Sequence, residues 1–369
     1  MSTSSPAPGH GSEPAPGGPA GPAGPASGGP PPAWTPHTCT QAWQAFAAST
    51  ESAGSPVADL AQAAAADPVL MAKVSEEGDV LPNLWLAAIR LRGGSLTVGY
   101  RAWRDWLIEH WTTVTAVLRQ RAVQTNEVNR CSYLMPALAQ IARQHQRPVA
   151  VIEFGASAGL LLNLARYRYA YDIGGVTTSV GPADSPVTVS CTATGDVPIP
   201  PELPRLGLRV GLDLHPLEAS NDADTAWLTN IGTWPGQDER RDRLFNALVI
   251  AREDPPVVMR GGLDRLRAVA EVADGMPLVV IDVGVARYLA PEQRAIYAHT
   301  VRDVLGAHHI CADMPAHLPL PLRPGQLDGW PDPPDPLTFV IMIDGQPVAQ
   351  TDPNGHHLYW HDGSPRAHA

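Results

Sequence analysis

The sequence is poor in features that mark several large classes of protein. It has one lysine, Lys73, and no apolar stretch approaches the roughly 18 uninterrupted residues that a membrane-spanning helix needs. The four cysteines, Cys39, Cys131, Cys191 and Cys311, form no CxxC pair, which argues against a zinc site and against a disulfide framework. We therefore expect a cytoplasmic protein that has no contact with a membrane and holds no metal.

Basic residues are also in the minority. The chain has a formal net charge of -11, so nucleic acid is an unlikely partner, because phosphate binding draws on a basic surface. A small-molecule ligand is the expected partner, and the composition leaves the oligomeric state open.

The composition changes along the chain. Residues 1–37 are dominated by Pro, Gly and Ala and hold too little apolar surface to offset the entropy of ordering, so we expect a disordered tail. Residues 38–147 show apolar spacings of three and four, which predict a helical cap region. Residues 148–363 alternate short apolar runs with helical patterns, which predicts an α/β domain.

The apolar runs of the second half predict strands at 149–154, 208–213, 257–260, 278–284 and 308–314. Helices are expected near 158–169, 222–251, 263–273 and 291–305. LTFVIMID, PVAQT and HHLYW follow, separated by turn residues typical of hairpins. The predicted fold is an open, mostly parallel Rossmann-like sheet with antiparallel C-terminal edge strands, preceded by the helical cap. Residues 170–206 form an insertion, which we expect to be a small hairpin over the strand ends.

Residues 151–163, VIEFGASAGLLLN, match the motifs of two different functions. Gly155 to Gly159 match G-x-S-x-G, the sharp turn that presents a nucleophilic serine in α/β-hydrolases. With Glu153, the same residues also match a nucleotide-type loop, in which spaced glycines let the backbone approach a ligand. A third possibility is a turn that only packs a helix closely against a strand.

The position of the loop favours ligand binding over hydrolysis. A nucleophile turn normally follows several earlier strands, whereas here the preceding residues are helical. A hydrolase partner set of Ser157, Asp282 and His356 or His357 is available, but 13 histidines offer such a set easily. The ligand loop instead needs an acid at the end of the next strand for ribose hydroxyls, and Asp213 is there.

The motifs EFGASAGLLLN, GLDLHPLE, TWPGQDERRDRL, VGVARYLAPEQR and TNEVNRCSYLMPAL resemble the bacterial family known as domain of unknown function 2332, over residues 40–363. The resemblance implies a sheet similar to that of class I S-adenosylmethionine-dependent methyltransferases. It places S-adenosylmethionine, or a related nucleoside, against the loop and the second strand. The implied cofactor-binding residues are Glu153, Gly155, Ala156, Ser157, Gly159 and Asp213.

The sequence departs from the methyltransferase pattern at three strand ends. Gly262 stands where an acid is expected to contact adenine, and Asp264 follows as the substitute. The fourth strand ends at Asp282, where the related sequences tend to have a histidine, and His215 replaces a more usual asparagine. These changes bear on methyl transfer more than on the fold. The alternatives are a serine hydrolase that uses Ser157 and a catalytically silent nucleoside-binding protein.

The cap contributes one further candidate. Asn126, Glu127 and Arg130 place an amide, a carboxylate and a guanidinium within about one helical turn, an arrangement suited to the amino-acid end of the cofactor. The competing interpretation is an ordinary ion pair within a helix. Asp282 and Glu127 are the candidates for a general base.

Overall fold

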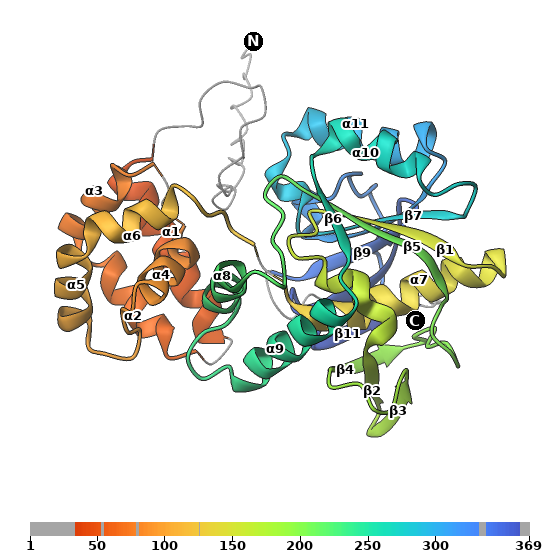
Figure 1. Cartoon of the computed structure of the whole chain (residues 1–369), viewed down its shortest axis with the longest axis horizontal. Helices are drawn as coiled ribbons and strands as arrows, with labels where there is room; N and C mark the ends of the chain where they lie inside the picture. The colour runs from red at the N-terminus through yellow and green to blue at the C-terminus, as the bar shows by residue number, and fades with distance from the viewer. Residues whose placement is uncertain (1–33, 53–54, 79–80, 125, 332–336, 362–369) are drawn as a thin grey trace, which may run out of the picture.

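The structure, a computed structural model, describes residues 34–52, 55–78, 81–124, 126–331 and 337–361. At its centre lies an 11-stranded sheet of order β3-β2-β4-β11-β10-β9-β8-β7-β1-β5-β6. Helices α1 to α6 form a separate body beside it, and α8 and α9 lie between the two (Figure 1). The expected tail lies outside the described residues up to residue 33, and its last two residues already belong to α1.

The strands are β1 (Val149–Phe154), β2 (Arg168–Ile173), β3 (Val176–Val180), β4 (Thr188–Gly195), β5 (Leu206–Asp213), β6 (Val257–Arg260), β7 (Leu278–Val283), β8 (His308–Asp313), β9 (Phe339–Ile343), β10 (Gln346–Thr351) and β11 (His357–Trp360). The helices of the cap are α1 (Pro36–Ser52), α2 (Val57–Ala65), α3 (Pro68–Ser75), α4 (Pro82–Leu91), α5 (Tyr100–Glu109) and α6 (Trp111–Leu118). The others are α7 (Cys131–His145), α8 (Asp222–Gly232), α9 (Asp238–Glu253), α10 (Leu263–Glu271) and α11 (Pro291–His299), with 3₁₀ turns η1 (Val128–Arg130), η2 (Leu160–Arg166), η3 (Ala286–Tyr288) and η5 (Pro315–His317) and the π-helical turn η4 (Thr300–Val304).

The parallel strands form a doubly wound block in the order β6-β5-β1-β7-β8. In chain order this is third, second, first, fourth and fifth, so the winding reverses between β1 and β7. All six residues of β1 are buried, which explains why VAVIEF is a nearly continuous apolar run. Such a reversal leaves a crevice outside the carboxyl ends of the strands, and this is where open α/β sheets bind their ligands.

The predicted fold class is confirmed, and the insertion has a role that its sequence did not show. β9 and β10 run antiparallel beside β8, and β11 follows β10 as expected. The insertion was expected to cover the strand ends, but its strand β4 pairs in parallel with β11, and β2 and β3 follow. The insertion thereby extends the sheet and supplies partners for the edge of β11, which would otherwise present unpaired backbone groups.

The helix expected near 158–169 is wrong in its second half, because only η2 forms and β2 begins at Arg168. Tyr167, Tyr169 and Tyr171 alternate along this segment, and their rings are fully buried. Their hydroxyls donate hydrogen bonds to the carbonyls of Leu160, Leu164 and Ser132, respectively. Burial of three rings on one face requires a period of two, so tertiary packing overrides the helical pattern.

Helix α7 belongs to the sheet, although it lies in the predicted cap region. Its apolar residues pack in one core with Val149 and Val151 of β1, whereas Ile152 and Phe154 face a second core that is covered by α10 and α11. The period of two along β1 thus assigns α7 and the cap to one face of the sheet. Glu153 projects toward that same face, because it follows Val151 by two residues.

A chain of polar contacts fastens the end of α7 to the sheet. His145 and His308 face each other through their Nε2 atoms at 2.9 Å, and His308 Nδ1 lies 2.7 Å from Asp344 Oδ2. The other oxygen of Asp344 accepts a hydrogen bond from the backbone N–H of His309. Its hydrogen bond with Asp344 raises the pKa of His308 above its ordinary value of 6.5. In its charged form His308 has a proton on both ring nitrogens, so its Nε2 donates to Nε2 of His145.

The stabilisation by this contact depends on pH. Because the folded-state pKa of His308 is raised, its contribution is complete below about pH 6.5 and is lost as the pH rises through the folded-state pKa. We expect Asp344→Asn to lower the free energy of unfolding by about 1 kcal/mol near pH 6 and by less near pH 9. Asn tolerates the positive φ of +52° at this position, so the backbone is preserved. Urea unfolding at the two pH values measures the difference.

Asp303→Asn is the matched control, because Asp303 pairs with His299 on an exposed helix surface. Its cost should be small at both pH values. If Asp344→Asn lowers the free energy of unfolding by the same amount as Asp303→Asn at both pH 6 and pH 9, the pH-dependent contact is contradicted.

Candidate functional site

The loop after β1 is a tight turn with three residues in left-handed conformations. Gly155, Ser157 and Gly159 have φ of +80°, +53° and +68°. Glycine adopts such angles freely, but a serine in this region is uncommon and marks a constrained site. A constrained serine fits both the nucleophile turn and the ligand loop, so the neighbours of Ser157 must decide between them.

Asp213 holds this loop in place from the end of β5. One carboxylate oxygen accepts a hydrogen bond from the backbone N–H of Ser157 at 2.8 Å, and the other accepts from the N–H of His215 at 2.7 Å. The carbonyl of Ser157 in turn accepts from the N–H of Leu217. The sequence predicted that Asp213 lies beside the loop, and the structure brings the two together. It adds a structural role, because both carboxylate oxygens already bind backbone amides.

The glycines of the loop are closely packed. A Cβ built on Gly155 would overlap the side chain of Val285, and one on Gly159 would lie 2.8 Å from Pro256 and 2.9 Å from Val258. Ala156, between them, is 1% exposed. Space at both glycines is therefore taken by the protein itself, and the loop is closed in this structure.

Two buried polar atoms of this region have no hydrogen-bond partner among the described residues. They are Oε2 of Glu153, near the end of β1, and Oγ of Ser157. Burial, and next the charge of Asp213, raise the pKa of Glu153 well above its ordinary value, while Arg130 opposes the rise. The environment of Glu153 thus favours its protonated form. Unpartnered buried polar atoms are costly, and they gather where a ligand completes the site.

The expected ion pair of Glu127 with Arg130 within a helix does not form. Glu127 lies before η1 in an extended conformation, and its carboxylate caps that turn by accepting from the N–H of Asn129. The same carboxylate is held by Arg240 at 2.7 Å and by Arg243 at 3.1 Å, both from α9. Burial acts to raise the pKa of Glu127, but these arginines outweigh it and lower the pKa.

Arg130 and Asn126 flank this pair. Arg130 donates from Nε to the carbonyl of Pro353 and is close enough to Glu153 to oppose the rise of its pKa. Asn126 is buried, and its Nδ2 has no partner within the described part of the chain. Of the cap candidates, Arg130 thus acts on Glu153 near the carboxyl end of β1.

The serine hydrolase partners are not brought together. Ser157 Oγ contacts no histidine among the described residues, and His356 Nδ1 lies 3.4 Å from Asp352. Asp282 is fully buried on the other face of the sheet, where its Oδ2 accepts from Tyr297 at 3.0 Å and lies 2.6 Å from His309 Nε2.

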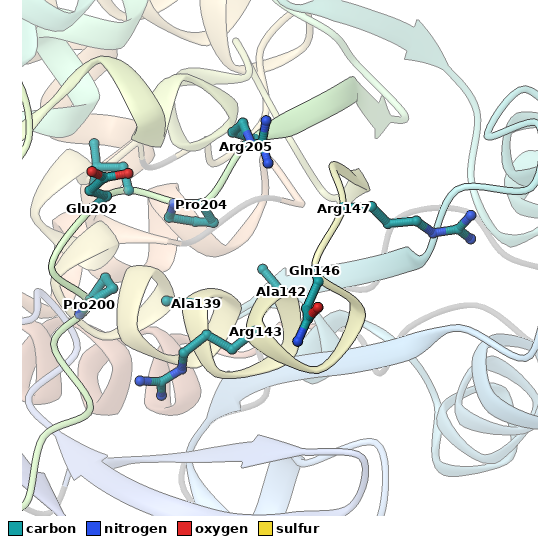
Figure 2. A pocket seen from close by; sticks show the side chains of 10 residues that line it. Ala139, Ala142, Arg143, Gln146, Arg147, Pro200, Glu202, Pro204 and Arg205 are labelled. Atoms are coloured by element: carbon teal, nitrogen blue, oxygen red, sulfur yellow. The ribbon is translucent and has the colours of Figure 1, made fainter.

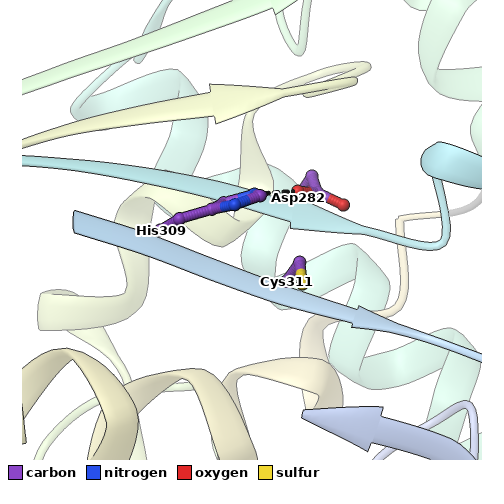
Figure 3. A group of neighbouring side chains, drawn as sticks. All are labelled: Asp282, His309 and Cys311. Atoms are coloured by element: carbon purple, nitrogen blue, oxygen red, sulfur yellow. Dashed lines mark hydrogen bonds and ion pairs between the residues drawn. The ribbon is translucent and has the colours of Figure 1, made fainter. Parts of the chain in front are cut away.

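Asp282, His309 and Cys311 form a buried group of potential metal ligands (Figure 3), with ligand atoms within 4.8 Å of one another. The Asp282–His309 separation of 2.6 Å is that of a hydrogen bond. Two ligands about 2 Å from one tetrahedral zinc ion lie more than about 3 Å apart, so this geometry does not suit a metal. Burial raises the pKa of the Cys311 thiol well above its ordinary value, which keeps it protonated.

The third strand end offers less than expected. Asp264 is exposed at the start of α10, and its Oδ1 accepts from the N–H of Gly262 at 3.1 Å. Leu214, which follows Asp213 directly, is 53% exposed. It presents an apolar surface beside the acid, and sequence analysis did not single it out.

Sequence analysis also missed a second group of polar residues. Arg240 and Arg243 of α9 are three apart, which places both on one helix face, and this spacing was the available signal. Asp313, at the end of β8, pairs with Arg287 at 2.5 Å, and its Oδ2 has no partner among the described residues. Tyr133 of α7 has a buried hydroxyl that likewise lacks a hydrogen-bond partner among the described residues.

A groove of about 620 Å³ lies at the opposite end of the parallel strands, lined by residues just before β1 and β5. Arg143, Arg147, Glu202 and Arg205 contribute charged side chains. Figure 2 shows the three guanidinium groups pointing in different directions. They do not converge on one ligand position, so this groove is a weaker candidate site than the loop.

Fold and site together define an α/β protein with a doubly wound sheet and a closed polar loop at its switch point. The profile of a family described as uncharacterized protein conserved in bacteria (DUF2332) matches residues 40–360, and the chain belongs to this family. The search of curated proteins gave no significant match, and neither did the search of solved structures. Among the described residues, no helix combines the length and apolar character of a membrane span.

The double hydrogen bond of Asp213 makes a stability prediction. Asp213→Ala removes the acceptor of two amide N–H groups, so we expect the free energy of unfolding to fall by about 2–4 kcal/mol. Asp213→Asn retains one acceptor oxygen and should lose about half as much. Urea unfolding followed by circular dichroism gives both values. Asp264→Ala is the control, since it removes one exposed hydrogen bond and should cost about 1 kcal/mol or less. Equal losses at the two positions would contradict the structural role of Asp213.

Proposed function

We propose that the carboxyl ends of β1 and β5 bind a nucleoside-type ligand, with S-adenosylmethionine as the first candidate. We further propose that the protein transfers the methyl group of this ligand to a small molecule. The observation that carries the proposal is the pair of unpartnered buried atoms, Glu153 Oε2 and Ser157 Oγ, at the switch point of the sheet. A polar ligand is what would satisfy them.

The neighbouring residues suit the parts of such a ligand. Each oxygen of Asp213 accepts one backbone N–H and retains capacity for a second donor, so the carboxylate can also take the hydroxyls of a ribose. Leu214 offers an exposed apolar side chain for the flat face of a base.

The closed loop implies a movement on binding. Val285 fills the space over Gly155, and Glu153 and Ser157 are each 5% exposed. Val285 lies in the connection after β7, so a shift of that connection would open the loop without disturbing the strands. Closure over the ligand would then exclude water from the site.

The bound cofactor would supply an activated methyl group, and the protein would supply orientation and a dry site. Neither predicted base is well placed. Asp282 lies inside the core with His309, and the arginines around Glu127 lower its pKa. An acceptor with a free lone pair at neutral pH, which needs no base, suits this site best. The alternative is a catalytically silent protein, which would bind the same nucleoside but would not transfer a methyl group.

Calorimetric titration with S-adenosylmethionine and with its demethylated product tests the binding. We expect saturable binding that Glu153→Gln weakens by about tenfold, the effect of one hydrogen bond to a charged or polarised group. Gln has the size of the neutral acid, so the free energy of unfolding should change by less than about 1 kcal/mol. Glu202→Gln, at the other end of the sheet, should bind like the wild type. If the folded protein binds neither compound, the nucleoside proposal is wrong.

Ser157 separates a ligand loop from a nucleophile. Since Ser157 Oγ has no hydrogen-bond partner within the described part of the chain, we expect no labelling of the wild type by a fluorophosphonate probe. Ser157→Ala should weaken nucleoside binding by at most about 1 kcal/mol, the contribution of one ordinary hydrogen bond. Stoichiometric labelling, measured by intact mass and abolished in Ser157→Ala, would instead establish a serine hydrolase.

A further inference from the structure

A cluster of arginines near the loop has fewer carboxylate partners than positive charges. Arg240 and Arg243 pair with Glu127, which is 2% exposed, and Arg130 follows Glu127 by three residues in the chain. The charge of Arg130 also acts on both Glu127 and Arg240. No carboxylate among the described residues lies within ion-pair distance of Arg130. Three guanidinium groups therefore share one carboxylate, which leaves a surplus of two positive charges.

Two other acids of this region do not pair with these arginines. Asp352, beside the Pro353 carbonyl that accepts from Arg130, pairs with His356 and accepts from the backbone N–H groups of Asn354 and His357. Burial disfavours the charged form of Glu153, and Glu153 has no ion-pair partner among the described residues. Neither acid pairs with an arginine of the cluster.

We propose that this cluster is the binding site of an oxyanion with two negative charges, the charge of a phosphate monoester. The two α9 side chains are largely enclosed, with 17% of Arg240 and 11% of Arg243 exposed. Like charges held this close, in a poorly hydrated place, raise the free energy of the protein unless an anion joins them. Such a surplus therefore marks a binding site more strongly than an exposed basic patch does.

The guanidinium groups retain donors for this anion. Nε of Arg240 lies 2.7 Å from Oε2 of Glu127 in an ion pair without a hydrogen bond, and both terminal nitrogens of Arg240 lack a hydrogen bond to any described residue. Arg243 uses Nε and one terminal nitrogen on the same carboxylate, which leaves the other. Glu127 thus fixes the orientation of both side chains, and a planar fork of N–H groups is the geometry that binds phosphate.

Two neutral donors complete the set. Asn126, adjacent to Glu127 in the chain, has a buried Nδ2 that lacks a partner among the described residues, and so does the hydroxyl of Tyr133, one turn beyond Arg130. Both are donors, and an oxyanion accepts from them without a further cost of burial. Asn126 directly precedes Glu127, and the charge of Arg130 acts on Tyr133, so these unpartnered donors lie in the same region as the arginines.

The proposal names the second substrate of the proposed methyl transfer. To that extent it rests on the proposed function, because Arg130 also acts on Glu153 and so links the cluster to the loop. The anion site itself stands without the nucleoside. The acceptor would be a small phosphorylated molecule, held by its phosphate beside the loop.

Inorganic phosphate is the probe for the experiment. Thermal melting and calorimetry are followed as phosphate replaces chloride at constant ionic strength, with succinate in a parallel series. We expect phosphate to raise the melting temperature of the wild type by mass action, beyond the effect of succinate. If the melting temperature in phosphate equals that in chloride, the site is overturned. If succinate raises the melting temperature more than phosphate does, the assignment to phosphate is overturned.

Variants on α9 separate specific binding from a general effect of the salt. Arg240→Gln should weaken phosphate binding by at least about tenfold, whereas Arg241→Gln should bind like the wild type, because Arg241 is exposed and pairs with Asp238 and Asp242. Equal phosphate responses of these two variants overturn the proposal. If Arg240→Gln does not fold, Arg130→Gln takes its place, since Arg130 has no carboxylate partner to leave unpaired among the described residues.

Titration with S-adenosylmethionine in chloride buffer keeps the two proposals apart. Nucleoside binding without a specific phosphate response overturns the anion site alone. A phosphate response without nucleoside binding leaves the anion site intact and removes the methyl transfer.

Discussion

The carboxylate of Asp213 is the contact on which the site depends. It joins the end of β5 to the loop after β1 by accepting from the N–H of Ser157, and it orders the segment after β5 by accepting from His215. The left-handed conformation of Ser157 is held in this way, and its carbonyl is then positioned for Leu217. Without that carboxylate, the constrained turn would lose the interaction that opposes its strain.

Electrostatic balance sets a second constraint. The pKa values of Glu153 and Glu127 shift in opposite directions. Glu153 has no ion-pair partner among the described residues, and burial raises its pKa, whereas the arginines of α9 lower the pKa of Glu127. One region thus combines an acid whose charged form is disfavoured with a positively charged cluster, which suits a ligand that has both polar and anionic parts.

The sequence predicted what depends on neighbours in the chain or on the shared edge of parallel strands. The apolar runs located β1, β5, β6, β7 and β8, and the proximity of Asp213 to the loop follows once those strands are parallel. The partners of Glu127 were beyond such reasoning, since Arg240 and Arg243 come from a helix far along the chain. The pairing of β4 with β11 was hidden for the same reason. The helix predicted after the loop failed because buried tyrosines imposed a different period.

The parallel pairing of β4 with β11 has a consequence for the order of folding. β4 is synthesised long before β11, and in the folded chain the other neighbour of β4 is β2. Until β11 emerges from the ribosome, one edge of β4 presents unpaired N–H and C=O groups, so the insertion must wait as an exposed three-stranded ribbon. Closing so long a loop is slow, which makes this interval the period of greatest risk for aggregation. The doubly wound block consists of β1 and β5 to β8, which all precede β11 in the chain. This block can therefore form before β4 pairs with β11.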